Sequence, residues 1–549
     1  MPTPASIDDL LTSLYGATRA PLVARRLRDL MRRHFPEDQA DRRRHDALPL
    51  TERDAMLITY ADQVREPGIA PLHTLASFLR AHAAGAITGL HVLPFFPSSS
   101  DDGFAVIDYR AVDRSLGTWD DIGALAREFN LMVDGVFNHV SGESDWFRRF
   151  LRDEPPFRDW FIVVQDEPDL SQVVRPRTLP LLTKFETAAG PKRVWTTFGP
   201  DQVDNNVKNP DVLLALLDVL LLYVKEGARF VRLDAIAYLW KEIGTSCIHL
   251  PQTHHVIQLM RAVLDVVAPD IMLITETNVA HRDNVSYFGD GTNEAQLVYN
   301  FALPPLVLHS LVTGNADALS RWATTLSLPS RRVAFLNFLA SHDGIGVTPA
   351  AGILTSAELE NLVTVAQRRG GFVSYRRNHD GTSSPYELNI NYLDALSDQS
   401  DPSEQVQIDR FVTAHAIMLA MPGLPAIYVH SLIGSRGDRA GAEASGMPRR
   451  VNRQRLVLAD LERELDDRAS RRSQVLRRLL ALLDRRRTTP AFQPAGGADV
   501  MQLDPRVFAL QRFSPDRNEQ AVCLHNVSPD RVAVIGESLA PYETRWLIG

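Results

Sequence analysis

The sequence has few cysteines and no long apolar run, and each shortage excludes a class of protein. Only two cysteines, Cys247 and Cys523, occur in 549 residues, too few for a disulfide framework or a cysteine metal site. The most apolar run, residues 212–224, is shorter than a membrane-spanning helix needs and contains Asp218, as a buried amphipathic helix would. The N-terminus lacks a basic stretch followed by an apolar core. We therefore expect a cytoplasmic protein that does not enter a membrane.

Positive charge is also scarce, because 59 Lys and Arg residues face 67 Asp and Glu residues and leave a net charge of −8. This balance disfavours nucleic acid as a general partner. Arginines do gather in residues 25–33 and 42–44, but acids interleave with them, which is typical of a solvated helical face. Apolar residues at 45% and charged residues at 23% indicate an ordinary globular protein, and the length predicts one large domain with smaller ones attached.

Eight short apolar segments, most of them separated by stretches of helical length, run through the middle of the chain. This alternation predicts an α/β fold, a (β/α)8 TIM barrel with inserted subdomains. The segments are MLITYAD (56–62), GLHVLPFFP (89–97), LMVDGVFNHV (131–140), RFVRLDAIAY (229–238), DIMLITETN (270–278), AQLVYNFALP (295–304), AFLNFLASHDG (334–344) and GLPAIYVHS (423–431).

The remaining segments predict further units around the barrel. Residues 1–53 have a helical pattern and form an N-terminal extension, and short alternating strands in residues 488–549 predict a C-terminal β-sandwich domain. The barrel then comprises residues 54–142 and 211–487, with residues 143–210 as an inserted B domain and a second insert at about 344–405. Long inserts at the catalytic end of a barrel usually form lids or binding loops.

Polar side chains stand at the ends of four of these strands, where a barrel enzyme places its chemistry. They are Asp134 with Asn138 and His139, Arg232 with Asp234, Glu276, and His342 with Asp343. A lone acid at a strand end is more often a cap, but four sets in barrel order favour a catalytic site. Two carboxylates are what retaining glycosidic chemistry needs, one as nucleophile and one as proton donor.

The four segments DGVFNH, GARFVRLD, ITET and FLASHD resemble, in order, the signature segments of the α-amylase superfamily (glycoside hydrolase family 13). The resemblance implies that Asp234 is the nucleophile, Glu276 the general acid/base and Asp343 the carboxylate that stabilises the transition state. Arg232 lies on the same strand face as Asp234 and is placed to keep that nucleophile ionised.

Further segments resemble the sucrose phosphorylase subfamily, among them GTSCIHLPQTH (244–254), YELNINYLDAL (386–396) and VNRQ (451–454). This resemblance implies a closed glucose pocket in which Asp101, Phe104, His139, His342 and Arg453 hold the sugar. It implies no metal or organic cofactor, with inorganic phosphate as co-substrate. A homodimer is one candidate assembly.

The acceptor side is more similar to glucosylglycerate phosphorylases, a group within this subfamily. Arg177 in RPR (175–177) and Tyr386 match the segments that serve phosphate and acceptor, whereas Glu387 stands where sucrose phosphorylases have Gln. An acceptor carboxylate needs positive charge, for which Arg177, Arg376 and Arg377 are candidates.

These resemblances predict a hexosyltransferase that converts 2-O-α-glucosylglycerate and phosphate into α-glucose 1-phosphate and glycerate. Alternatives are phosphorolysis of sucrose, sucrose 6'-phosphate or glucosylglycerol, an α-glucosidase or transglucosidase, and a non-catalytic sugar-binding barrel. The intact acids and Arg232 argue against the last.

Overall fold

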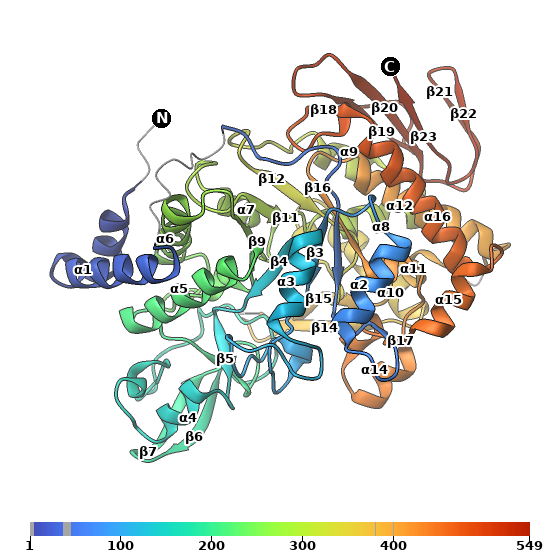
Figure 1. Cartoon of the computed structure of the whole chain (residues 1–549). Helices are drawn as coiled ribbons and strands as arrows, with labels where there is room; N and C mark the ends of the chain where they lie inside the picture. The colour runs from blue at the N-terminus through green and yellow to red at the C-terminus, as the bar shows by residue number, and fades with distance from the viewer. Residues whose placement is uncertain (1–4, 37–45, 379, 399) are drawn as a thin grey trace.

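Eight parallel strands form a closed barrel at the centre of the molecule, as a computed structural model shows for residues 5–36, 46–378, 380–398 and 400–549 (Figure 1). The barrel closes because the first strand pairs with both the second and the last. The predicted TIM barrel and all eight of its strands are confirmed. The strands are β1 (Met56–Thr59), β3 (Gly89–Val92), β4 (Asn130–Gly135), β9 (Ala228–Leu233), β10 (Met272–Thr275), β11 (Leu297–Tyr299), β12 (Ala334–Asn337) and β16 (Leu424–Tyr428).

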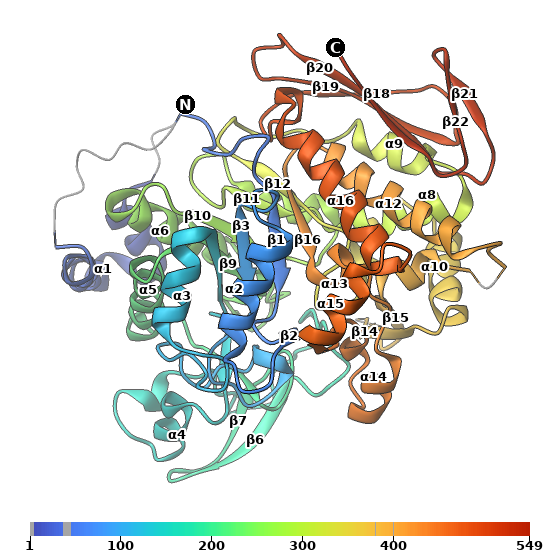
Figure 2. The ribbon, with the colours of Figure 1, turned by 45° about the vertical axis from the view of Figure 1, so that its right-hand side comes forward.

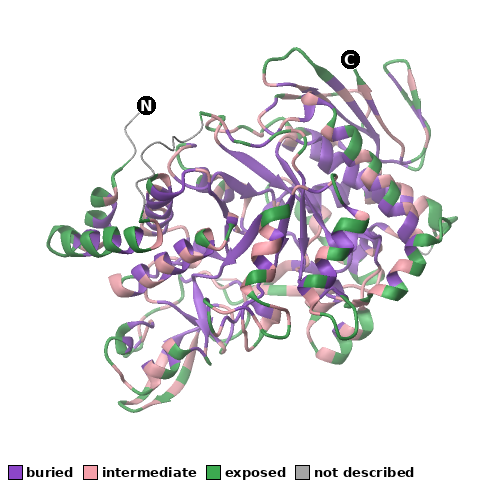
Figure 3. Cartoon of the chain, in the orientation of Figure 1, coloured by how far each residue is buried: buried purple, intermediate pink, exposed green. Residues whose placement is uncertain are grey.

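Helices surround the barrel and leave its strands buried, which explains why the strands are continuous apolar runs (Figure 3). The predicted amphipathic helix is α5 (Pro210–Lys225), which begins where the Asn209 side chain caps the first turn. The other long covering helices are α2 (Pro71–His82), α3 (Trp119–Glu128), α6 (Pro251–Val267), α8 (Leu303–Thr313), α12 (Glu404–Ala420) and α16 (Arg471–Arg487).

The first insert lies at the carboxyl end of β4. The antiparallel pair of β5 (His139–Ser141) and β8 (Gln202–Asp204) joins it to the barrel. The insert itself contains α4 (Asp145–Leu151) and the hairpin of β6 (Leu182–Thr187) and β7 (Gly190–Trp195).

The second insert follows β12 and carries a three-stranded antiparallel sheet. Its strands are β13 (Ile345–Gly346), β14 (Phe372–Arg377) and β15 (Ser383–Asn389), with α10 (Ser356–Arg368) and α11 (Tyr392–Leu396) around them. Figures 1 and 2 both place the two inserts at the lower end of the barrel, so they cover the same ends of the strands.

The described start of the N-terminal extension is α1 (Ile7–His34), two helical segments that meet at a kink, and it packs on α5 and α6. The backbone of α1 is kinked at Gly16, whose φ is 76°. Residues 46–55 continue without a helix, and the arginine-rich residues 42–44 lie outside the described residues. No helix among the described residues has the length and apolar character to cross a membrane.

The C-terminal region packs on the opposite end of the barrel from the inserts (Figure 2). It contains an antiparallel sheet of β18 (Ala498–Met501), β19 (Val507–Phe513), β20 (Gln520–Asn526) and β23 (Thr544–Ile548). A hairpin of β21 (Val532–Val534) and β22 (Glu537–Leu539) shares a small apolar cluster with Val507, Ala509 and Leu524 of this sheet.

Candidate active site

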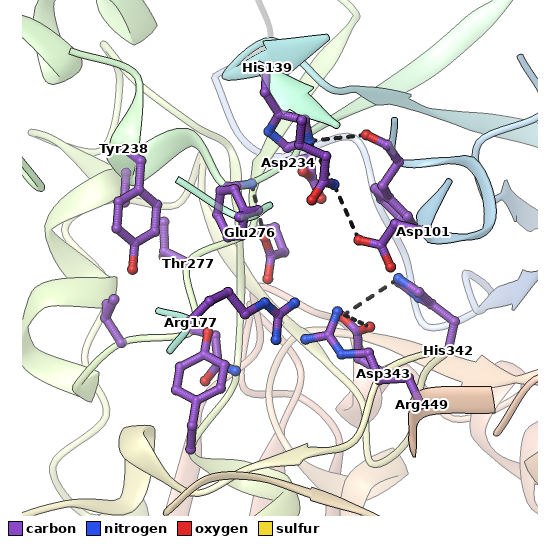
Figure 4. Close-up of a pocket in the computed structure, with 18 residues that line it drawn as sticks. Asp101, His139, Arg177, Asp234, Tyr238, Glu276, Thr277, His342, Asp343 and Arg449 are labelled. Carbon is purple, nitrogen blue, oxygen red and sulfur yellow. Dashed lines mark hydrogen bonds and ion pairs between the residues drawn. The ribbon is translucent and has the colours of Figure 1, made fainter. Parts of the chain in front are cut away.

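A pocket opens at the carboxyl ends of the barrel strands, beneath the two inserts. It brings together most of the residues that the sequence predicts for a site, although they come from segments far apart in the chain (Figure 4). Those that line it are Asp101, Phe104, His139, Arg177, Asp234, Glu276, His342, Asp343 and Tyr386.

Asp234 lies directly after β9 and shares the guanidinium of Arg232 with Asp134. Arg232 Nη1 lies 2.9 Å from Asp234 Oδ1 and also pairs with the fully buried Asp134, whose Oδ2 lies 2.7 Å from His91 Nε2. Burial raises the pKa of Asp234, and Arg232 works against this rise. Asp134 and His91 therefore hold Arg232 where it supports an ionised Asp234.

Glu276 follows β10 and faces the same space as Asp234. Its Oε2 accepts a hydrogen bond of 3.0 Å from the backbone N–H of Ala235, and Arg232 Nη2 lies farther off, at 3.8 Å. Burial is the main cause that raises the pKa of Glu276, to about 7. Ala235 has a left-handed φ of 47°, and this uncommon backbone conformation holds its N–H against Glu276. Glu276 is thus the carboxyl better suited to donate a proton at neutral pH.

Asp343 completes the group of three acids and is tied to two arginines. Its Oδ1 lies 2.9 Å from Arg449 Nη1 and 3.2 Å from Arg453 Nη2. Burial acts to raise the pKa of Asp343, but the guanidiniums of Arg449 and Arg453 hold it well below its usual range. Asp343 is therefore a permanent negative charge beside the reacting centre.

The closed end of the pocket is built around Asp101 and Asp102, which both adopt left-handed backbone conformations with φ of 52° and 47°. Gln202 Nε2 donates to Asp101 Oδ2 at 3.2 Å. Arg453 does not line this pocket: it lies behind the wall, where it donates to Asp102 at 2.7 Å and to the backbone carbonyl of His342 at 2.9 Å. Arg453 thus holds Asp102, His342 and Asp343 in position around the pocket.

One phenyl ring and two imidazoles shape the rest of this side of the pocket. The rings of Phe104 and His342 stack, with centroids 4.9 Å apart and planes inclined by 8°. His139 Nε2 lies 3.0 Å from the carbonyl oxygen of Phe104 and 3.2 Å from Gln202 Nε2. Burial lowers the pKa of His342 to about 3 and also lowers that of His139, so both imidazoles are neutral at pH 7.

The part of the pocket for which the sequence predicts phosphate and acceptor binding differs, because it holds the cation Arg177. Arg177 enters the pocket near Arg449 (Figure 4), and no Asp or Glu of the described chain lies within ion-pair distance of its guanidinium. Tyr386 on β15 and Tyr238 beside β9 line the same part of the pocket. Burial raises the pKa of both phenols, which therefore stay protonated.

Glu387 does not line this pocket, but it lines a smaller cavity beside it together with Glu276 and Asp343. It is 1% exposed, and Arg449 Nε and Nη2 donate to its carboxylate at 2.9 and 3.0 Å. Glu387 therefore holds Arg449, and Arg449 holds Asp343.

Sequence reasoning missed Arg449, Gln202 and Tyr238 in the pocket wall. Arg449 lies only four residues before Arg453, so the spacing of the VNRQ segment was the one available signal for it. Gln202 belongs to a β-bridge that no periodicity predicts.

A buried ion pair fixes the first insert to the barrel. Lys241 Nζ pairs with Asp204 and donates to Asn138 Oδ1 at 2.6 Å, and Thr197 donates twice to Asp204 at 2.7 Å. Next to it, the backbone N–H of Asn205 donates to the carbonyl of Asn138 at 2.9 Å. Among the residues described, no group of three His, Cys, Asp or Glu side chains is arranged to hold a metal ion.

Comparison with known proteins agrees with this geometry. Residues 84–348 match the family model described as alpha amylase, catalytic domain. The chain is 48% identical to a glucosylglycerate phosphorylase of Allomeiothermus silvanus over 99% of this chain and 98% of the relative, and 51% identical to one of Spirochaeta thermophila over 88% and 81%. The crystal structure of sucrose 6F-phosphate phosphorylase from Thermoanaerobacter thermosaccharolyticum superposes with a TM-score of 0.76 at 26% identity, covering 90% of this chain and 98% of that one.

Proposed function

We propose that this chain, which belongs to the α-amylase family and within it to the phosphorylase branch, is a glucosylglycerate phosphorylase. It exchanges the glycerate of 2-O-α-glucosylglycerate for phosphate and keeps the α configuration at the anomeric carbon. The near full-length similarity to glucosylglycerate phosphorylases supports this substrate. The pocket supports the chemistry.

In the first step the Asp234 carboxylate attacks the anomeric carbon. The bond from that carbon to the bridging oxygen breaks, and Glu276 donates its proton to this oxygen. Glycerate leaves with its hydroxyl group restored, and a β-glucosyl ester on Asp234 remains. The pKa of about 7 for Glu276 supports the proton donation. Asp343 stabilises the positive charge that develops on the sugar ring.

In the second step an oxygen of hydrogen phosphate attacks the same carbon from the side that glycerate left. The ester bond breaks, Asp234 is again a carboxylate, and Glu276 takes the proton of the attacking phosphate. The product is α-glucose 1-phosphate. Two inversions give net retention.

The observation that carries this proposal is Arg177, which enters a pocket of carboxylates and has no acidic partner among the residues that the structure describes. A hydrolase needs no cation where water attacks. A phosphorylase does, because the phosphate dianion would otherwise be repelled by Asp343 and Glu276. Arg177 can hold the phosphate oxygens with paired N–H donors and can hold the glycerate carboxylate in the reverse reaction.

The test is to incubate the protein with 2-O-α-glucosylglycerate, with and without phosphate, and to measure glucose 1-phosphate and free glucose. We expect glucose 1-phosphate only with phosphate and much less free glucose. Equal release of glucose with and without phosphate would identify a hydrolase or transglucosidase. Parallel assays with sucrose, sucrose 6'-phosphate and glucosylglycerol identify the acceptor. We also propose a cytoplasmic location and a homodimer, the second of which light scattering can test.

A further inference from the structure

The two inserts touch each other at one backbone bridge outside the pocket, and an arginine stands on each side of it. Arg175 of the first insert forms an isolated antiparallel bridge with Arg377, at the end of β14 in the second insert. Two positive side chains therefore meet where two segments about 200 residues apart cover the pocket.

Neither arginine has an acidic partner within ion-pair distance among the residues that the structure describes. Arg175 Nη2 donates to the carbonyl oxygen of Leu179, and the exposed Arg377 forms no ion pair with any described side chain. Burial and, next, the charge of Arg377 lower the pKa of Arg175, which reflects the repulsion between the two groups. Other neighbouring arginines share an acid: Arg449 and Arg453 share Asp343, and Arg368 and Arg369 share Asp398.

A groove lies at this contact. Its volume is about 400 Å³, and it is lined by Leu170, Arg175, Thr178, Pro180, Leu181, Leu182 and Arg377. Arg177, two residues after Arg175, lines the catalytic pocket. Arg376, next to Arg377, lies near enough to Tyr238 in the pocket wall for its charge, like that of Arg177, to lower the pKa of this phenol against the larger effect of burial. Positive groups thus continue from the groove to the catalytic pocket.

We propose that Arg175 and Arg377 form a second anion site at the mouth of the pocket, which binds phosphate, and in the reverse direction a carboxylate, before it reaches Arg177. An anion between the two guanidiniums removes their repulsion and joins the two inserts. The site solves an electrostatic problem, because an anion must approach a centre that holds Asp101, Asp234, Glu276 and Asp343. This inference rests on the proposed phosphorolysis.

The experiment uses the double variant R175Q R377Q with α-glucosyl fluoride as a donor that carries no charge. Fluoride release is measured at low ionic strength with rising phosphate, and again with water as the only acceptor. We expect kcat/KM for phosphate to fall about tenfold, whereas fluoride release to water falls less than about twofold. The difference in kcat/KM for phosphate between the wild type and the variant should decrease as salt is added.

R19Q R25Q is the matched control, because it removes the same charge from exposed positions of α1, and we expect it to match the wild type. R175K R377K keeps both charges and should recover most of the phosphate dependence, which also shows that the segment still folds. Phosphate kinetics of R175Q R377Q within about twofold of wild type at low salt, or an equal loss with water, overturns the second site. Absence of any phosphate effect in the wild type instead overturns the proposed phosphorolysis.

Discussion

The sugar side and the acceptor side of the pocket are built on different principles. On the sugar side each charged group has a fixed partner: Arg453 holds Asp102 and Asp343, and Arg232 holds Asp134 and Asp234. On the acceptor side Arg177 has no acidic partner in the part of the chain that the structure describes. A preorganised sugar site suits a glucosyl unit that never changes, whereas a free cation suits an acceptor that alternates between phosphate and glycerate.

The three acids of the fixed side also follow barrel strands, whereas the free cation lies on an insert. Asp234, Glu276 and Asp343 follow barrel strands, whose buried packing sets their positions. Arg177 and Tyr386 stand on segments that enter from outside the barrel. Catalysis is therefore a property of the barrel, and acceptor choice is a property of the inserts.

The largest effect should come from Asp234→Asn. The amide cannot form the glucosyl ester, so we expect glucose 1-phosphate formation to fall by at least about 10⁴-fold. The melting temperature shows whether the variant folds. Activity within about tenfold of wild type in a folded variant would refute the assignment of the nucleophile.

Glu276→Gln should distinguish the two roles of the acids. We expect turnover of glucosylglycerate to fall by about 10²–10⁴-fold, because the leaving oxygen receives no proton. Single-turnover release of fluoride from α-glucosyl fluoride should fall far less, since fluoride leaves without a proton. Equal losses with both donors would show that Glu276 acts only through the position of Asp234.

Arg177→Gln addresses the acceptor side alone. Loss of charge-assisted hydrogen bonds of about 1.5–3 kcal/mol predicts a decrease of about 10- to 100-fold in kcat/KM for phosphate. Single-turnover fluoride release, which reports the sugar side, should change much less. If both rates fell together, the two sides would not be independent.

Lys241→Met tests how the first insert is held. The buried Asp204 loses its cation, and we expect the free energy of unfolding to fall by about 3–5 kcal/mol in denaturant titrations. The control is Lys208→Met, whose pair with Glu242 is exposed and should contribute at most about 1 kcal/mol. Similar losses for both variants would contradict the structural role of the buried pair.

The smallest effects concern pH. Burial raises the pKa of Glu276 to about 7, so kcat/KM for glucosylglycerate should decrease as pH rises through this value and Glu276 loses its proton. Burial also raises the pKa of Asp234, to about 6, so activity should decrease again as pH falls below it and the nucleophile is protonated. With α-glucosyl fluoride the decrease in kcat/KM at high pH should disappear, because fluoride needs no proton to leave. If the decrease remained, a group other than Glu276 would cause it.

The sequence by itself determined the barrel and the identity of its three acids. Four of the apolar runs end in polar residues, and parallel strands bring their carboxyl ends to one face, so Asp234, Glu276 and Asp343 were expected to meet there. Only the tertiary structure decided that Glu387 faces Arg449, that Arg453 lies behind the wall, and that Arg175 meets Arg377. No repeating pattern in the sequence reveals these three contacts, because they join segments 62 to 351 residues apart and depend on how whole loops pack.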